Sequence, residues 1–354
     1  MGAVIIDRRL LSDGLPLSVS VQSDHDLGDV TRLAGVAAET QGFDRTDGER
    51  VRLVASGMAT DLVRHTTSGR VFVRVVECGD LGGVELVATG QSPGIPVADA
   101  SDGRSVHANA RGLGAIADVC DLFDVYGAPG RGTVMMARLF GGTPGVSCES
   151  PFLVGSMREP IVGEDVCGDA WAVAQSGTRV VALVADGLGH GVDAAAASAA
   201  AVTAFRQRSQ APVEDIVAHI HGALLGTRGA ALAVAEIDPG MGRVRFCGIG
   251  NIAARLLVAD ADKSLVSQFG IAGYHSPKIR AYDQGWQEGA LLVMHSDGLS
   301  SSWDLRGYLG LLGHHPQLAA ATVMRDAVRA NDDALVLALR DGHVATGATM
   351  VEVR

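Results

Sequence analysis

Hydrophobic and polar residues follow a different order in the two halves of the chain. In the first half, two stretches with helical periodicity precede two strand-like stretches, which a Gly-containing turn joins. A long loop, a third helix that opens on glycines and a β-hairpin complete this half. The predicted elements cover 29–43, 49–66, 70–77, 83–89, 111–123 and 124–140. This order predicts an α/β domain.

The second half consists mostly of short apolar segments of strand length, with three helical segments among them. The predicted strands cover 170–175, 178–186, 229–238, 242–250, 253–260, 290–298 and 333–340, and the predicted helices cover 192–207, 213–225 and 317–330. Many strands with few helices predict an α+β sandwich in which helices cover the sheet faces. A stretch rich in Gly, Pro and Ser, Gly141–Pro151, separates the halves, so we expect domains at 1–142 and 148–342.

Composition favours a soluble protein with two packed domains. The length of 354 residues exceeds the usual size of one domain, and the net charge of -11 argues against nucleic acid or an anionic membrane as the main partner. The five cysteines are scattered and form no CxxC pair, which argues against a disulfide framework or a zinc site. No apolar run has the length of a signal peptide or a membrane span. We therefore expect a cytoplasmic protein.

Four apolar strands of the second half begin or end at an aspartate. Asp186 and Asp297 each follow a strand and precede a glycine, whereas Asp169 and the pair Asp332 and Asp333 come directly before a strand. Each position alone fits an ordinary turn or cap residue. Adjacent strands could bring the four positions together, and clustered carboxylates repel one another unless cations lie between them.

The chemistry of such a cluster is that of hard metal ions. Oxygen ligands without His or Cys select Mg²⁺ or Mn²⁺. Two such ions about 3.5–4 Å apart can hold a bridging water and lower its pKa, which makes it a nucleophile for hydrolysis of a phosphate ester. The glycine after Asp186 leaves room for its backbone carbonyl to act as a further ligand.

The motifs "GEDVCGDAW", "VADGLGHG", "MHSDGL" and "NDDALV", with "GIGNIAARL" between them, resemble the SpoIIE-like branch of the metal-dependent (PPM) serine/threonine protein phosphatases, and RsbX-type phosphatases in particular. The resemblance covers Cys148 to Arg340 and implies an α-β-β-α sandwich with two Mn²⁺ or Mg²⁺ ions. It implies that Asp186 bridges the ions and that the Gly187 carbonyl ligates one of them. Asp297 and Asp332 would ligate the other ion, and Asp169 would act in catalysis by holding metal-bound water.

Three further polar residues flank these motifs. Some members of the family carry a histidine directly after the Asp-Gly pair to protonate the leaving group, and this chain has Leu188 there. His190 lies two residues further on, and both a leaving-group acid and a structural residue remain open for it. We expect His295 to be a packing residue and Asn251 to bond to backbone in its own turn.

The first half resembles the GHKL (Bergerat) ATP-binding fold of RsbW- and RsbT-like anti-sigma-factor kinases, a two-layer α/β sandwich. The order of elements, "SPGI", "RGLGAIADVCD" and "APGRGT" carry this resemblance, which covers Asp29 to Phe140. It implies nucleotide contacts at glycines of the two boxes, namely Gly94, Gly112 and Gly114. However, Gly57 and Gly90 occupy the positions of the family's catalytic glutamate and adenine-reading aspartate, and Asp61 that of its Mg²⁺-binding asparagine. We therefore expect a degenerate regulatory domain, with ATP as an alternative ligand.

These resemblances imply an enzyme that removes phosphate from serine or threonine of a bacterial stress-response or sigma-factor regulatory protein. The expected partner is a phosphorylated STAS, anti-anti-sigma or stressosome-like protein, and a homodimer through the N-terminal domain is a further expectation. Two alternatives remain open. The chain could be a catalytically silent module that sequesters a signalling partner, or a bifunctional kinase-phosphatase.

Overall fold

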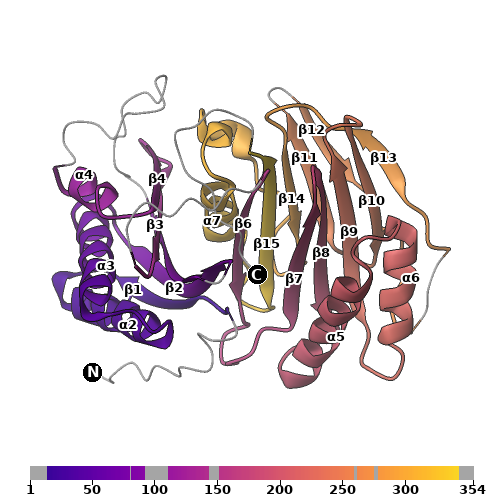
Figure 1. Ribbon diagram of the computed structural model, residues 1–354, viewed down its shortest axis with the longest axis horizontal. Coiled ribbons are helices and arrows are strands. Elements are labelled where there is room, and N and C mark those ends of the chain that lie inside the picture. Colours follow the sequence, from indigo (N-terminus) through magenta and orange to yellow (C-terminus); the bar gives the residue numbers. More distant parts are fainter. Residues whose placement is uncertain are drawn as a thin grey trace. The chain divides into compact units, whose positions relative to one another are not determined.

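The computed structural model describes residues 14–79, 81–91, 111–142, 151–258, 261–274 and 278–342 (Figure 1). The described residues form two compact units. The first unit contains the residues up to Leu153 together with Leu305–Thr322, and the second unit contains the remaining residues from Val154 onward. Each unit is described below by itself.

The first unit is a two-layer arrangement of helices on an antiparallel sheet. Its strands have the order β1-β2-β3-β5-β4. They span β1 (Leu17–Val21), β2 (Gly69–Cys78), β3 (Leu81–Gly90), β4 (Leu122–Ala128) and β5 (Gly132–Phe140). The helices are α2 (Leu27–Thr40), α3 (Arg45–His65) and the short α4 (Arg111–Ala117), after a single turn η1 (Asp24–Asp26). The helices α2 and α3 cover one face of the sheet, and their apolar sides form the core with it (Figure 1).

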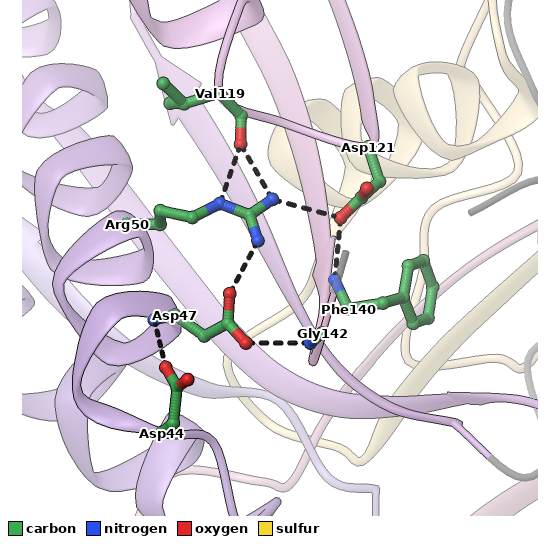
Figure 2. A network of polar contacts seen from close by, with 7 residues as sticks. All are labelled: Asp44, Asp47, Arg50, Val119, Asp121, Phe140 and Gly142. Atoms are coloured by element: carbon green, nitrogen blue, oxygen red, sulfur yellow. Dashed lines mark hydrogen bonds and ion pairs between the residues drawn. The ribbon is translucent and has the colours of Figure 1, made fainter. Parts of the chain in front are cut away.

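A buried polar network holds the start of α3 against the last strands of the first unit (Figure 2). The guanidinium of Arg50 donates to Asp47 at 2.7 Å and to the carbonyl of Val119 at 3.0 Å, and it lies 3.4 Å from Asp121. Asp47 also accepts from the backbone N–H of Gly142 at 2.7 Å. Because each carboxylate has several donors, the network can stay charged inside the domain and fixes where the chain leaves β5.

Within the same unit, the segment Leu305–Thr322 contacts β4. It contains the single turns η3 (Leu305–Gly307) and η4 (Leu311–Gly313) and the start of α7 (Pro316–Ala327). The Tyr126 hydroxyl donates to the carbonyl of Leu309, and Asp124 accepts from the backbone N–H of His315 at 2.7 Å.

The second unit contains two five-stranded antiparallel sheets that face each other (Figure 1). The first has the order β13-β10-β9-β8-β7 and the second the order β12-β11-β14-β15-β6. The first sheet is built from β7 (Asp169–Ser176), β8 (Arg179–Gly187), β9 (Ala230–Asp238), β10 (Arg243–Ile249) and β13 (Tyr282–Gly285). The second is built from β6 (Phe152–Glu159), β11 (Ala253–Val258), β12 (Ala261–Leu265), β14 (Leu291–His295) and β15 (Ala334–Asp341).

Two helices, α5 (Val192–Arg208) and α6 (Val213–Ala223), cover the outer face of the first sheet. The buried side of α5 is mostly alanine, which lets the helix lie close to β7 and β8. The mixed α/β architecture with antiparallel sheets agrees with the fold class expected from the sequence. Among the described residues, no helix combines the length and the apolar character that a membrane span needs.

Cys78, at the end of β2, is disulfide-bonded, whereas Cys120, Cys167 and Cys247 are free thiols. An odd, scattered set of cysteines argues against a framework of several bridges, but it does not exclude a single one.

Candidate metal and phosphate site

Two of the predicted aspartates face each other across a strand pair. Asp169 is the first residue of β7, and it pairs in register with Asp186 near the end of β8. The backbone N–H of Gly187 donates to the carbonyl of Gly168 at 3.1 Å, which extends the ladder by one more bond. Asp169 is fully buried, and among the described residues neither of its carboxylate oxygens has a partner at hydrogen-bond distance, although the Ser296 hydroxyl lies near enough to lower its pKa. A buried carboxylate without a partner costs several kcal/mol, so this arrangement is unusual unless a ligand completes it.

The other two predicted aspartates come from the facing sheet. Strands β14 and β15 pair up to His295 and Val336, and the N–H of Ser296 then donates to the carbonyl of Leu335. This places Asp297, two residues after β14, beside the chain that enters β15 through Asp332. Asp297 also accepts a 2.5 Å hydrogen bond from the side-chain amide of Asn251.

The four carboxyl groups act on one another electrostatically, so the structure brings them together at one end of the two sheets. Burial raises the pKa of Asp186 to about 9, and the neighbouring charges of Asp169, Asp297 and Asp332 add to this effect. Burial also raises the pKa of Asp169 to about 7, assisted by nearby acidic groups and opposed by the Ser296 hydroxyl. The pKa of Asp297 is raised by burial and by Asp332. Such upward shifts are the signature of carboxylates that share a site.

Both Asp-Gly pairs need their glycine because another backbone passes very close. A Cβ atom on Gly187 would lie 2.0 Å from the carbonyl oxygen of Ala194, in the first turn of α5. A Cβ atom on Gly298 would lie 1.9 Å from the carbonyl oxygen of Asp333. No side chain fits at either position, so the two aspartates are held by closely packed main chain.

The structure separates the roles of Asp332 and Asp333. The carboxylate of Asp333 is buried and accepts from the backbone N–H groups of Ile161 and Gly168, both at 2.8 Å. Asp332 is half-buried, and its charge acts on the other three aspartates of the cluster. Asp333 thus serves the fold, and Asp332 is the one of the pair that remains available to a ligand.

The donor set fits a hard divalent cation. It offers carboxylate oxygens from four strand ends, with no imidazole or thiolate among them, and both oxygens of Asp169 are buried without a hydrogen-bond partner among the described residues. Within the described part of the chain, no three His, Cys, Asp or Glu side chains are already arranged to hold a metal ion. Instead, a hydrogen bond joins Asp186 and Asp297, which requires a proton on one of them. A bound cation would replace that proton as the positive charge between the carboxylates.

Two of the flanking histidines have identified hydrogen-bond partners. The ring nitrogen Nδ1 of His190 lies 3.0 Å from Glu164, and this exposed pair closes the loop after Asp186. His295 is buried and accepts at Nε2 from the indole N–H of Trp303. Its Nδ1 therefore carries the proton and donates to the carbonyl of Ser296 at 2.8 Å. Burial lowers the pKa of His295, so the ring is neutral.

Asn251 was expected to bond to backbone, and that expectation is wrong because its amide donates to Asp297. The available signal was its position directly after the apolar strand that ends in "GIG", which repeats the pattern of the acidic motifs.

The candidate nucleotide residues of the first unit are only partly described. Gly94 lies outside the described residues, and Gly112 and Gly114 lie in α4, which has seven residues. A Cβ atom on Gly57 would lie 2.5 Å from the Ile116 side chain, so α3 and α4 pack together at this point. Asp61 is buried with one carboxylate oxygen unpartnered, and burial raises its pKa.

Comparison with known proteins gives matches over the second half of the chain. Residues 176–341 match the family described as Stage II sporulation protein E (SpoIIE). The phosphoserine phosphatase RsbX of Bacillus subtilis (strain 168) is 27% identical over 150 residues, which cover 42% of this chain and 74% of that protein.

Solved structures show a similar likeness. One, described as "The bacterial stressosome: a modular system that has been adapted to control secondary messenger signaling", is 28% identical with a TM-score of 0.51, over 54% of this chain and all of that one. RsbX in complex with magnesium is 21% identical with a TM-score of 0.48, over 54% of this chain and 96% of that one. The matches identify a serine/threonine protein phosphatase of the stress-response regulatory kind.

Proposed function

We propose that the second unit hydrolyses phosphoserine or phosphothreonine on a bacterial stress-response or sigma-factor regulatory protein, with two divalent cations, Mn²⁺ or Mg²⁺, at the aspartate cluster. The observation that carries this proposal is the convergence of Asp169, Asp186, Asp297 and Asp332 from two facing sheets, with mutually raised pKa values. The likeness to the phosphoserine phosphatase RsbX gives the reaction class.

Each residue of the cluster has a distinct task in this proposal. Asp186 interacts electrostatically with the other three carboxyl groups and would bridge the two ions, with the Gly187 carbonyl as a further ligand of one of them. Asp297 and Asp332 would hold the second ion, and Asn251 keeps the Asp297 carboxylate oriented through its 2.5 Å hydrogen bond. Asp169 is the buried acceptor that would hold water at the site. The ions, when bound, would supply Lewis-acid activation of water and offset charge on the phosphoryl oxygens.

The test is phosphate release from a phosphoserine-containing protein with and without Mn²⁺. We expect wild type to be active only with the metal, and Asp186→Asn and Asp297→Asn to lose almost all activity. Asp238→Asn is the matched control, because Asp238 ends β9 at the opposite end of the same sheet and accepts only from the backbone of its own turn. Equal activity of wild type and Asp186→Asn would refute the proposal. A silent binding module would also show no metal-coupled heat in calorimetry.

The substrate that we propose is a phosphorylated component of a stressosome-like assembly, a STAS or anti-anti-sigma protein. Support comes from the stressosome structure that the second half of the chain resembles, and from RsbX. A purified STAS-domain phosphoprotein should be hydrolysed with a much higher kcat/KM than a short phosphoserine peptide. Equal kcat/KM values for the two substrates would contradict the proposal that the enzyme recognises a STAS-domain protein.

For the first unit, we propose a degenerate GHKL-like domain with a regulatory rather than a kinase role. The antiparallel sheet under α2 and α3 supports the fold assignment. Two close contacts support the loss of the nucleotide site: Gly57 lies against Ile116, and a Cβ atom on Gly90 would lie 2.4 Å from Thr66. Neither position has room for an acidic side chain. Titration of the full chain with Mg-ATP should leave its melting temperature unchanged, and ATP turnover would revive the bifunctional alternative.

A further inference from the structure

Arg329 is held beside the aspartate cluster by main-chain hydrogen bonds. Its backbone N–H donates to the carbonyl of Gly298 at 2.8 Å, and Ser300 donates to the carbonyl of Ala327 at the same distance. Between these bonds, Val328 pairs with Leu299 as an antiparallel bridge. Main-chain hydrogen bonds therefore join the segment before Asp332 to the segment after Asp297. The same hydrogen bonds that position these two aspartates also position Arg329.

The side chain of Arg329 is exposed, and it forms no ion pair with a carboxylate of the described residues. Its Nη1 lies 3.4 Å from the backbone carbonyl oxygen of Asp297, and this is the one side-chain contact that it makes among the described residues. Most of the five N–H donors of the guanidinium therefore face solvent beside the site.

Two other arginines near the cluster are less available to a ligand. Arg228 donates to the carboxylate of Asp193 at 2.6 Å, and Arg158 donates to the backbone carbonyl of Asp169 and is half-buried. A guanidinium left exposed beside Asp297, one of the four clustered carboxylates, can serve in two ways. It can balance their charge, or it can bind an anion that approaches them. Its contact with a carbonyl rather than with a carboxylate oxygen favours the second role, because charge balance would be better served by a direct ion pair.

We propose that Arg329 is the residue that binds the phosphoryl group of the substrate and the orthophosphate product. This inference rests on the function proposed above and adds to it the cationic contact for the phosphate. The planar guanidinium can donate two parallel hydrogen bonds to phosphoryl oxygens that the aspartates themselves would repel. The phosphate would thus lie between Arg329 and the cations held by the cluster.

The experiment compares wild type, Arg329→Ala and Arg329→Lys, with Arg206→Ala as the control that removes the same charge from an exposed position on α5. Two quantities are measured in the presence of Mg²⁺: the dissociation constant of inorganic phosphate by calorimetry, and the kinetics of phosphoprotein hydrolysis. The affinity for Mg²⁺ alone is measured in parallel.

For Arg329→Ala we expect phosphate binding to weaken by about tenfold to a hundredfold, with a similar rise in KM, and Mg²⁺ affinity within about twofold of wild type. Arg329→Lys should recover part of the loss, and Arg206→Ala should match wild type. Unchanged phosphate binding in Arg329→Ala, or a loss of Mg²⁺ affinity that accounts for the whole effect, would overturn the inference. So would a wild type that does not bind phosphate. Phosphate binding that depends on Arg329 in a protein without hydrolysis would uphold the inference and refute the proposed function instead.

Discussion

Asp186→Asn should stabilise the protein after metal removal while it abolishes hydrolysis. The substitution keeps the shape of the side chain but removes its titratable group from the cluster. In wild type, burial and three acidic neighbours raise the pKa of Asp186 to about 9 from its ordinary value of 3.8. Near neutral pH the folded chain must therefore hold a proton that the unfolded chain has released. Asparagine needs no such proton.

The size of the effect follows from linkage. Each pH unit above the ordinary value costs about 1.4 kcal/mol while the folded group stays protonated, which gives a limit of about 5 kcal/mol at about pH 7.5. Because Asp186 and Asp297 are hydrogen-bonded and titrate together, we expect about 2–3 kcal/mol of this to be recovered by the substitution. For a unit of roughly 150–250 residues, the size class of the second unit, that corresponds to a rise in melting temperature of roughly 4–12 °C.

The assay is thermal unfolding of EDTA-treated wild type, Asp186→Asn and the control Asp238→Asn, each repeated with Mn²⁺. The order of stabilities should reverse on adding the metal, because only wild type and the control can gain from it. A variant that is less stable than wild type in EDTA would show that Asp186 is stabilised by its surroundings and carries no electrostatic cost. That result would refute the argument that burial and neighbouring carboxylates destabilise the metal-free protein at Asp186.

Four other outcomes follow from the same geometry. After EDTA treatment, the free energy of unfolding of wild type should fall as the pH rises from about 5 to about 9. The stabilisation by the bound proton is fully present below the ordinary pKa of 3.8 and is lost as the pH approaches the raised pKa of about 9. Thermal unfolding with Mn²⁺ should not show this pH dependence. Gly187→Ala should cost about 3 kcal/mol or more in urea unfolding because of its 2.0 Å approach to Ala194, and an unchanged midpoint would contradict that packing. Asp332→Asn should remove the stabilisation by Mn²⁺ and have little effect on the stability of the EDTA-treated protein. Asp333→Asn should destabilise the EDTA-treated protein by about 1–3 kcal/mol because it weakens two buried hydrogen bonds. Calorimetric unfolding with and without Mn²⁺ distinguishes these two effects. Asn251→Ala should weaken Mn²⁺ binding by roughly tenfold in a titration, and equal affinity would show that its hydrogen bond does not orient Asp297.

The strands that hold the aspartates could be predicted because they are short, apolar and end abruptly at a charged residue. β8 and β14 were placed to within a few residues for this reason. The strands that were missed lack that signal. β12 is mostly exposed, with three polar residues in its middle, and β6 directly follows the Gly- and Pro-rich segment that the composition assigns to a linker. Their place in the sheet depends on partners that are distant in the sequence.

The third helix of the first half shows a different limit. The periodicity predicts a helix over 111–123, but α4 ends at Ala117 and β4 begins at Leu122. Asp121 accepts from the backbone of Phe140 and lies in the Arg50 network, so tertiary contacts of the buried carboxylate draw this segment into the sheet. The polar partners of Asp121 come from α3 and β5, far away in the sequence, and local periodicity contains no information about them.

The cluster also explains why such rigid strands surround it. Four carboxylates at strand ends oppose folding, so the site persists only where other contacts hold the main chain in place. The two Asp-Gly pairs provide this, because each glycine lets a second backbone approach within contact of the chain. Asp333 adds hydrogen bonds to two further loops, and the apolar core under α5 is fully buried. The repulsion among the carboxylates is relieved when a cation binds, and the main chain that carries the aspartates is already in place for it, so part of the unfavourable free energy becomes binding affinity.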